Sequence, residues 1–384
     1  MAGNLKRDYT QISQSAEQAG LSSHLNLVQE LVLSPDNNRQ FQLLEATPEI
    51  LEAIESSRKI VFRGEEEDDV TLCVDNATFD VRIAETSNTL LLSPNCIWPQ
   101  RDHGSSFQEC KVQECQTWAI PKSYLELRKC GPRIHKLKRL LQENPFKGVD
   151  DTKENKYTLK DLLNKVQASE GELLAAIEAM NACNIDGYWR ILDESYKEQV
   201  FQCIINLVEE KDWNFHNFSL GECCDILEEL YPRFIINHCI KCYGTIDEDK
   251  CFLDEDKVCR QCAISILKPA GKFNYEEFMQ CWESSVPIGM HTKIEQLKGY
   301  ALTDTTSKPP VIWLFQVSEL PPDPYVRFNK LFKVRTKWSL EEIEPYIKDL
   351  ATGSQSLNTI LLKYTRTSTD LVRGIKVYSS KKLA

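Results

Sequence analysis

The chain has 384 residues, of which 42% are hydrophobic and 27% charged, a balance typical of a folded protein with two to four domains. No apolar run approaches the ~18–20 residues of a membrane-spanning helix, and the N-terminus lacks the apolar core of a signal peptide, so we expect no membrane partner. The net charge of −11 argues against a surface that binds nucleic acid throughout.

The charge is unevenly distributed along the chain. Residues 327–384 contain 12 Lys and Arg and 5 Asp and Glu, a net charge of +7, which leaves −18 on the other 326 residues. A basic end on an acidic body is an informative charge asymmetry, and it makes the C-terminal region a candidate for contact with nucleic acid.

Residues 1–143 are expected to be rich in strands. In TFDVRIA (residues 78–84), apolar and polar residues alternate, which is typical of a strand with one buried face. Residues 48–58 predict one amphipathic helix, and the acidic run Glu65–Asp69 is interpreted as a solvated hairpin tip. Short strands with turn signals favour a small barrel or sandwich. The strand candidates are residues 41–44, 60–62, 70–74, 78–84 and 89–92.

A basic run follows at residues 124–141, which hold six Lys and Arg between 128 and 139 without one acid. Two interpretations stay open. The run is either a patch for nucleic acid or an acidic partner, or the solvated face of a helix with Leu137, Leu140 and Leu141 packed beneath it. The polar segment 144–156 is interpreted as a linker between two halves.

Residues 157–192 predict two helices and a short hairpin. Leu159, Leu162, Leu163 and Val166 form one apolar stripe, and Thr158 and Ser169 each precede an acid by three residues, the spacing of a capping box. Gly187 then separates two segments of strand propensity. This order is the outline of a winged helix-turn-helix.

The same outline recurs near the C-terminus. WSLEEIEPYIKDL carries a cap at Ser339 and an apolar stripe, SLNTILLKY predicts a second helix, and GIKVYSSKK predicts a wing. A weaker copy is expected between residues 195 and 282. We therefore predict an α+β protein with a barrel-like domain (1–143), a linker (144–156) and three winged helices, at 157 to about 212, 213–282 and 283–384.

Two CxxC pairs, Cys239/Cys242 and Cys259/Cys262, have a spacing that fits a zinc site. Zinc ligands of this type usually lie on tight turns, whereas both pairs here fall inside predicted helices. We therefore favour buried thiols and no cofactor over zinc. The sequence contains no phosphate-binding loop, HExxH or GxSxG motif, so we expect no enzyme activity.

Several long stretches resemble one family. They are RGEEEDDVTLCVDNATFDVRIAETSNTLLL, NACNIDGYWRIL, FNYEEFMQCWESSVPIGM, RFNKLFKVRTKWSLEEIEPYI and IKVYSSKKLA. Together they identify the chain as a member of the "defective in sister chromatid cohesion" family of sister chromatid cohesion proteins. The similarity runs from about Phe41 to Ala384, and the second CxxC is not part of the family pattern.

The resemblance implies a nuclear, non-catalytic subunit of an alternative, chromosome-transmission-fidelity-type replication factor C. That complex loads and unloads the PCNA sliding clamp at replication forks and supports cohesion, including cohesin acetylation. The N-terminal domain would pair with a small subunit and with the C-terminal tail of the large ATPase subunit in a composite barrel. The first winged helix would contact the catalytic subunit of DNA polymerase epsilon, and the last would bind DNA.

Candidate residues follow from this division. The second helix of the first unit carries only acids, which would repel phosphate and suit a protein partner; Trp189 is either part of that contact or a core residue of the wing. The candidate protein contacts are Phe79, Val81, Ile83, Leu90, Leu91, Leu92, Glu170, Glu172, Tyr188, Trp189 and Arg190. The candidate contacts to DNA, bound independently of sequence, are Lys333, Arg335, Lys337, Lys363, Arg366, Arg373, Lys376, Lys381 and Lys382.

Two other functions stay open. A winged-helix transcriptional regulator would need a helix rich in base-reading side chains, and SLNTILLKY offers only Asn358 and Lys363. A zinc enzyme using the four cysteines would lack a general base. The basic C-terminal residues could alternatively serve only to keep the tail solvated.

Overall fold

The computed structural model describes residues 8–21, 28–33, 41–96, 112–148, 154–351, 356–370 and 374–381. The chain mixes helices and strands, which confirms the predicted α+β class, and it divides into two compact units. The first comprises residues 1–60 and 79–128, and the second comprises residues 61–78 and 129–384. Among the described residues, no helix is long and apolar enough to cross a membrane.

The first unit contains two parallel strand pairs. β1 pairs with β6 from Val28↔Val112 to Val32↔Gln116, and β2 pairs with β7 at Leu43↔Tyr124. Strands β2, β7, β5, β4 and β3 are neighbours in that order in one five-stranded sheet. The elements up to residue 130 are α1 (Tyr9–Gln18), β1 (Val28–Val32), β2 (Leu43–Leu44), α2 (Pro48–Glu55), β3 (Ile60–Arg63), β4 (Thr71–Val74), β5 (Ala77–Glu85), β6 (Val112–Gln116) and β7 (Ser123–Cys130).

The first unit buries little of its apolar surface. Ile50 and Ala53 of α2 and Phe79 of β5 are buried, but Ile83 is 71% exposed and Trp118 is also exposed. The three large hydrophobic clusters of the described residues all lie in the second unit. Exposed apolar strand residues of this kind are typical of a surface that another chain covers.

The second unit repeats one arrangement four times within residues 135–381: a helix, a short strand, two more helices and a hairpin. The first-repeat elements are α3 (His135–Glu143), a bridge at Tyr157, α4 (Leu159–Lys165), α5 (Glu170–Ala179), β8 (Cys183–Ile185) and β9 (Tyr188–Arg190). The second-repeat elements are α6 (Glu194–Glu210), β10 (Phe218–Ser219), α7 (Leu220–Leu227), α8 (Arg233–Tyr243), β11 (Gly244–Asp247) and β12 (Lys250–Leu253).

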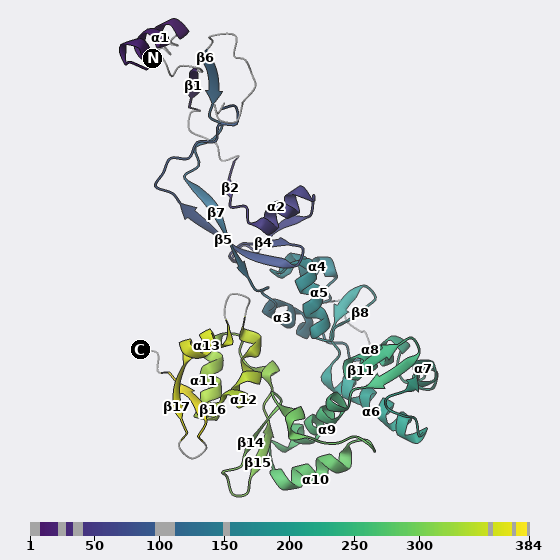
Figure 1. Cartoon of the computed structure of the whole chain (residues 1–384). Helices are drawn as coiled ribbons and strands as arrows, with labels where there is room; N and C mark the ends of the chain where they lie inside the picture. The colour runs from purple at the N-terminus through teal and green to yellow at the C-terminus, as the bar shows by residue number, and fades with distance from the viewer. Residues whose placement is uncertain are drawn as a thin grey trace. The chain divides into compact units, whose positions relative to one another are not determined.

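The third and fourth repeats follow the same order, and Figure 1 shows them in green and yellow. The third-repeat elements are α9 (Glu255–Ala270), β13 (Lys272–Asn274), α10 (Tyr275–Ser285), the 3-10 helix Ile294–Leu297, β14 (Ala301–Asp304) and β15 (Val311–Leu314). The fourth-repeat elements are α11 (Pro324–Val334), β16 (Lys337–Ser339), α12 (Leu340–Ile343), α13 (Leu357–Tyr364), β17 (Thr365–Thr369) and β18 (Lys376–Ser380).

The strand order is the same in each repeat. The sheets read β10-β12-β11, β13-β15-β14 and β16-β18-β17, so the last strand of the hairpin is always central. In the first repeat Tyr157 bridges to Trp189 of β9, which in turn pairs with β8. Side-chain caps begin most of the helices, though not α3 or α8, with complete capping boxes at Thr158, Ser169 and Ser339, as their spacing predicts.

The repeats do not follow the predicted boundaries. α3 packs its buried Leu137, Leu140 and Leu141 with α4 and α5, so the segment 144–156 lies within the first repeat rather than before it. α6 instead shares a core with α7 and α8. The predicted boundary at residues 282 and 283 divides the third repeat, because β13 pairs with β15. The predicted helix over residues 340–350 is broken into α12 and two 3-10 turns, where Pro345 lacks the backbone N–H that a continuous helix requires.

Candidate nucleic-acid interface

The fourth repeat holds the predicted DNA-binding residues on a closed core. Trp338 of β16 is fully buried, its indole N–H donates to the Arg335 carbonyl at 2.8 Å, and its ring lies 5.7 Å from that of Tyr346. Ile360 and Leu361 of α13 and Tyr378 of β18 complete the same cluster. This core fixes the helices and the hairpin on which the cations lie.

Six of the nine predicted cations are exposed: Lys333, Lys337, Lys363, Arg366, Lys376 and Lys381. None of the six forms an ion pair with a carboxylate of the described residues. Arg373 and Lys382 lie outside the described residues. Exposed cations that are not paired with carboxylates are the groups that phosphate contacts require.

Arg335 is used within the fold instead. Its guanidinium donates to Glu342 at 2.9 Å and to the Thr303 carbonyl, and it lies 5.2 Å from the ring centre of Trp338. Its side chain therefore joins the end of α11 to the cap of α12 and to the third repeat. The sequence signal of a basic residue is the same for Arg335 and Lys337, so only the structure separates their roles.

The exposed cations lie in two groups. In the sheet, Ser379 of β18 pairs with Lys337 on one side and with Arg366 on the other, so both cations lie on one face across three strands. At the end of α13, Lys363 follows Leu362, whose carbonyl accepts a hydrogen bond from the Lys381 ammonium at 3.3 Å. The two groups present positive charge from both the helix and the hairpin.

The exposed face of α13 offers few groups that read bases. Its solvent-facing side chains are Asn358, Thr359, Leu362 and Lys363. Of these, only Asn358 and Lys363 carry groups of the kind that make bidentate contacts to base edges. The chemistry of this surface therefore favours phosphate contacts, which carry no sequence information.

The first repeat carries the opposite charge on the equivalent helix. Glu170 and Glu178 of α5 are exposed, and α5 contains no Lys or Arg. Glu172 is not a free surface acid, because its Oε2 accepts from the Thr78 hydroxyl at 2.5 Å, the Ser169 hydroxyl at 2.7 Å and the Ser169 N–H at 3.1 Å. Glu172 therefore has a structural role that its place in an acidic helix did not reveal.

The wing residues of the first repeat differ in burial. Tyr188 is exposed beside Lys156, and Trp189 packs partly against the core of α3, α4 and α5. Arg190 is buried and donates to the Asn144 carbonyl at 3.1 Å and the Asn144 side chain at 2.8 Å. Of the three, only Tyr188 is exposed, with 37% of its surface accessible to a partner.

The predicted contacts of the N-terminal unit divide in the same way. Phe79 is buried, whereas Val81, Leu90 and Leu92 are half-buried. Ile83 and Leu91 are exposed. The predicted strand at residues 89–92 is reduced to one bridge between Leu92 and Ala119.

The acidic tip and the basic run bind each other, which sequence reasoning missed. The Lys136 ammonium of α3 lies 2.6 Å from Glu65 Oε2 and 3.7 Å from Asp68 Oδ2. Nearby, the buried Gln167 amide donates to the carbonyls of Arg63 at 3.1 Å and Asp69 at 2.5 Å. The one sequence signal for this contact is that residues 65–69 are acidic and residues 128–139 are basic.

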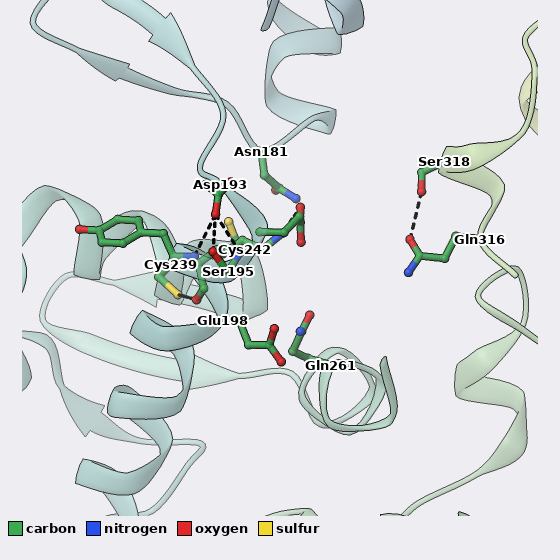
Figure 2. Close-up of polar contacts among 12 residues, drawn as sticks. Asn181, Asp193, Ser195, Glu198, Cys239, Cys242, Gln261, Gln316 and Ser318 are labelled. Atoms are coloured by element: carbon green, nitrogen blue, oxygen red, sulfur yellow. Dashed lines mark hydrogen bonds and ion pairs between the residues drawn. The ribbon is translucent and has the colours of Figure 1, made fainter. Parts of the chain in front are cut away.

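The four CxxC cysteines lie inside α8 and α9, as predicted. Figure 2 shows Cys239 and Cys242 beside Asp193 and Ser195, and the carboxylate of Asp193 caps the start of α6. Burial raises the pKa of Cys242 to about 11 and that of Cys262 to about 12, so both sulfurs stay protonated near neutral pH. Among the described residues no group of three His, Cys, Asp or Glu side chains is placed to hold a metal.

Comparison with known proteins shows which family this sequence resembles. A family model described as sister chromatid cohesion protein Dcc1 matches residues 41–347. The chain is 40% identical to the sister chromatid cohesion protein DCC1 of Homo sapiens, over 89% of this chain and 88% of that protein. It is 40% identical to DCC1 of Xenopus tropicalis over 93% of each chain. It is 28% identical to the probable DCC1 of Dictyostelium discoideum over 86% of this chain and 91% of that one. The chain therefore belongs to the Dcc1 family of sister chromatid cohesion proteins.

Proposed function

We propose that the protein is a non-catalytic, nuclear subunit of an alternative replication factor C clamp loader that loads and unloads PCNA at replication forks. In this role it links the loader to DNA polymerase epsilon and to DNA, and thereby supports cohesion, including cohesin acetylation. Membership of the Dcc1 family supports the proposal. The observation that carries it is one repeated arrangement with an acidic helix at α5 and exposed cations at α13 and the last hairpin.

We infer that the repeats are winged-helix domains. The support is the order of helix, strand, two helices and a two-stranded wing, with the last strand central in each sheet. The structure has four such repeats where the sequence predicts three domains. The fourth would bind DNA, and the first would contact the polymerase.

DNA binding by the fourth repeat can be tested in the full chain. We expect that Ala at Lys363, Arg366, Lys376 and Lys381 lowers the affinity for duplex DNA and flattens the salt dependence by about one logarithmic unit per lost contact. The matched control replaces four exposed lysines of the first and second repeats with Ala, removing the same charge. The control lysines are Lys160, Lys211, Lys241 and Lys250.

Fluorescence anisotropy with labelled duplexes of two unrelated sequences, at several salt concentrations, measures both quantities. Equal affinity for the two sequences supports phosphate contacts and disfavours the transcriptional regulator. Undetectable binding by the unchanged protein at low salt, or equal losses in both variants, would refute the DNA-binding proposal.

We propose that the N-terminal unit forms a barrel shared with the small clamp-loader subunit and the C-terminal tail of the large subunit. The exposed Ile83 and Leu91 and the isolated β1–β6 pair support a surface that other chains complete. Asp at Ile83 should prevent co-purification with both partners and leave DNA binding unchanged. Asp at Ile288, an apolar residue of the third repeat that is 93% exposed, is the control. Retained partners in the Ile83 variant would refute a contact through this strand.

For the polymerase we propose a contact through α5 and the wing of the first repeat. Glu170→Lys with Tyr188→Ala should weaken polymerase capture, because both side chains are exposed. Glu172 is unsuitable as a probe, since its replacement breaks internal hydrogen bonds. Circular dichroism checks folding. Unchanged capture by a folded double variant would exclude this surface.

A further inference from the structure

The turn between α7 and α8 exposes three large apolar side chains. Leu230 is 67% exposed, Phe234 44% and Ile226 43%. Arg233 ion-pairs with Asp225 and, at 2.8 Å, with Glu228, which holds the first turn of α8 beside the last turn of α7. The apolar side chains therefore belong to one end of this helix pair, which we name the α7–α8 patch.

The patch is built on an ordered turn. Leu230 N–H donates to the Leu227 carbonyl at 3.0 Å, and Tyr231 N–H donates to the same carbonyl at 2.9 Å. The Tyr231 ring lies 5.9 Å from that of Tyr196, and its hydroxyl lies 3.6 Å from the Cys203 sulfur. These contacts hold the turn against α6. A partner therefore binds a turn that is already ordered.

The inner face of the same helices already has its full set of contacts. Cys223, Cys224 and Leu227 of α7 and Ile235 and Ile236 of α8 are buried in the core. Ile226 and Leu230 are therefore apolar residues outside this core, and the ring of Phe234 lies 6.4 Å from that of the core residue Phe146 while remaining 44% exposed. Single exposed apolar residues are ordinary, but three within nine residues of one turn indicate a binding surface.

The rim of the patch is acidic. Four acids, Glu222, Asp225, Glu228 and Glu229, lie in the same segment as the three apolar residues, and Arg233 is the one cation among residues 220–234. The net charge of −3 for this rim repels phosphate, which excludes nucleic acid. It complements a surface in which lysine or arginine flanks an apolar stripe.

We propose that the α7–α8 patch docks an amphipathic helix of a protein partner that carries Lys and Arg beside its apolar stripe. Such a helix places apolar side chains at i, i+3, i+4 and i+7 against the three exposed residues, while its cations reach the acidic rim. The inference does not depend on the DNA or polymerase contacts, because it uses a different repeat and the opposite charge from the DNA-binding surface.

The test uses the full chain and two synthetic amphipathic 18-residue peptides of about equal hydrophobicity, one built from Leu and Lys and the other from Leu and Glu. Anisotropy of the labelled peptides measures binding. We expect the Leu/Lys peptide to bind and the Leu/Glu peptide not to. Leu230→Asp should weaken binding of the Leu/Lys peptide by about tenfold or more, because the leucine side chain would be buried against the peptide in the complex.

The variant also separates docking from general attraction. Leu230→Asp adds a negative charge, so a peptide held only by the acidic surface would bind the variant as well as or better than the unchanged protein. Leu362→Asp adds the same charge at a leucine that is 72% exposed on α13, and it should leave the affinity unchanged. Equal effects of the two substitutions, binding of the Leu/Glu peptide, or no binding of the Leu/Lys peptide would each overturn the proposal.

Discussion

The first and fourth repeats share an arrangement and differ in what their surfaces can bind. In both, a capping box begins a helix and its acid lies three residues after a serine: Glu172 after Ser169, and Glu342 after Ser339. The exposed charges are opposite, with acids on α5 and cations on α13 and the last hairpin. The fold therefore sets the geometry of a binding surface, and a few exposed side chains decide whether phosphate is attracted or repelled.

The two capping acids also have different neighbours. Glu342 accepts from Arg335 of its own repeat, whereas Glu172 accepts from Thr78 of the β4–β5 hairpin. Gly171 lies so close to this hairpin that an added Cβ would fall 1.7 Å from the Asn76 side-chain oxygen. The first repeat is therefore stabilised by a segment that lies about ninety residues earlier in the sequence.

The largest expected contrast concerns the tryptophan of each sheet. Trp338→Ala should cost about 3–5 kcal/mol because it empties a fully buried site. Trp189→Ala removes a partly exposed ring and should cost only about 1–2 kcal/mol. Urea unfolding followed by circular dichroism measures both. Equal losses would mean that Trp189 is a core residue of its wing.

The capping acids provide the second contrast. Glu172→Ala leaves the buried Thr78 hydroxyl without its carboxylate acceptor, whereas the Ser169 N–H keeps the Thr78 hydroxyl oxygen at 3.1 Å; the substitution should destabilise the first repeat by about 2–3 kcal/mol. Glu342→Ala removes an ordinary cap and should cost about 1 kcal/mol. Hydrogen exchange should rise in residues 61–78 only for the first substitution. Unchanged protection of residues 61–78 from exchange in Glu172→Ala would contradict the packing of this segment on α5.

Reversing the charge of α5 tests whether the charge of the exposed surface is sufficient to decide DNA binding. Glu170→Lys with Glu178→Lys on α5 should raise the affinity of the full chain for duplex DNA about threefold at about 50 mM salt. Gln at both positions removes the repulsion of phosphate without adding a cation, so it should raise the affinity for DNA less than Lys does. No change with lysine would show that the shape of the first repeat, rather than its charge, prevents DNA binding.

The smallest expected effect concerns Asp161 in the capping box of α4. The hydrogen bond from Thr158 lowers the pKa of Asp161, so this carboxylate stabilises the fold above its unfolded pKa of about 4 and loses that effect as the pH falls further. Asp161→Asn should remove this part of the acid dependence. Amide exchange of α4 between about pH 3 and 6 measures it, and an unchanged profile would contradict the assignment.

Local signals in the sequence predicted much of the helical part. The caps at Thr158, Ser169 and Ser339 were correct, because a cap is a contact between residues three apart. The helix over residues 340–350 was wrong beyond Ile343, since the apolar stripe continues through Pro345 although the hydrogen-bonding pattern does not. Predictions that depend on neighbouring residues succeeded where no proline intervened.

Long-range packing explains most of what was missed. The basic face of α3 resembles an exposed patch in sequence, yet Lys136 binds the acidic hairpin tip some seventy residues away. Likewise, periodicity cannot show which residues between 61 and 78 bind Glu172 and Gln167. The number of repeats was also underestimated, because strands of two to four residues such as β10 and β13 give too short a pattern.

The second and third repeats share one hydrophobic core, which also includes Phe146, Cys183, Ile185 and Leu192 of the first repeat. Neither repeat can open without exposing apolar surface of the other, so these two repeats should lose their structure together as one cooperative block. The fourth repeat has a separate core around Trp338, and α3, α4 and α5 have another. When the chain is heated or pulled through its ends, the fourth repeat and the helices α3, α4 and α5 should therefore unfold first, and the middle pair should persist as a folded spacer between them.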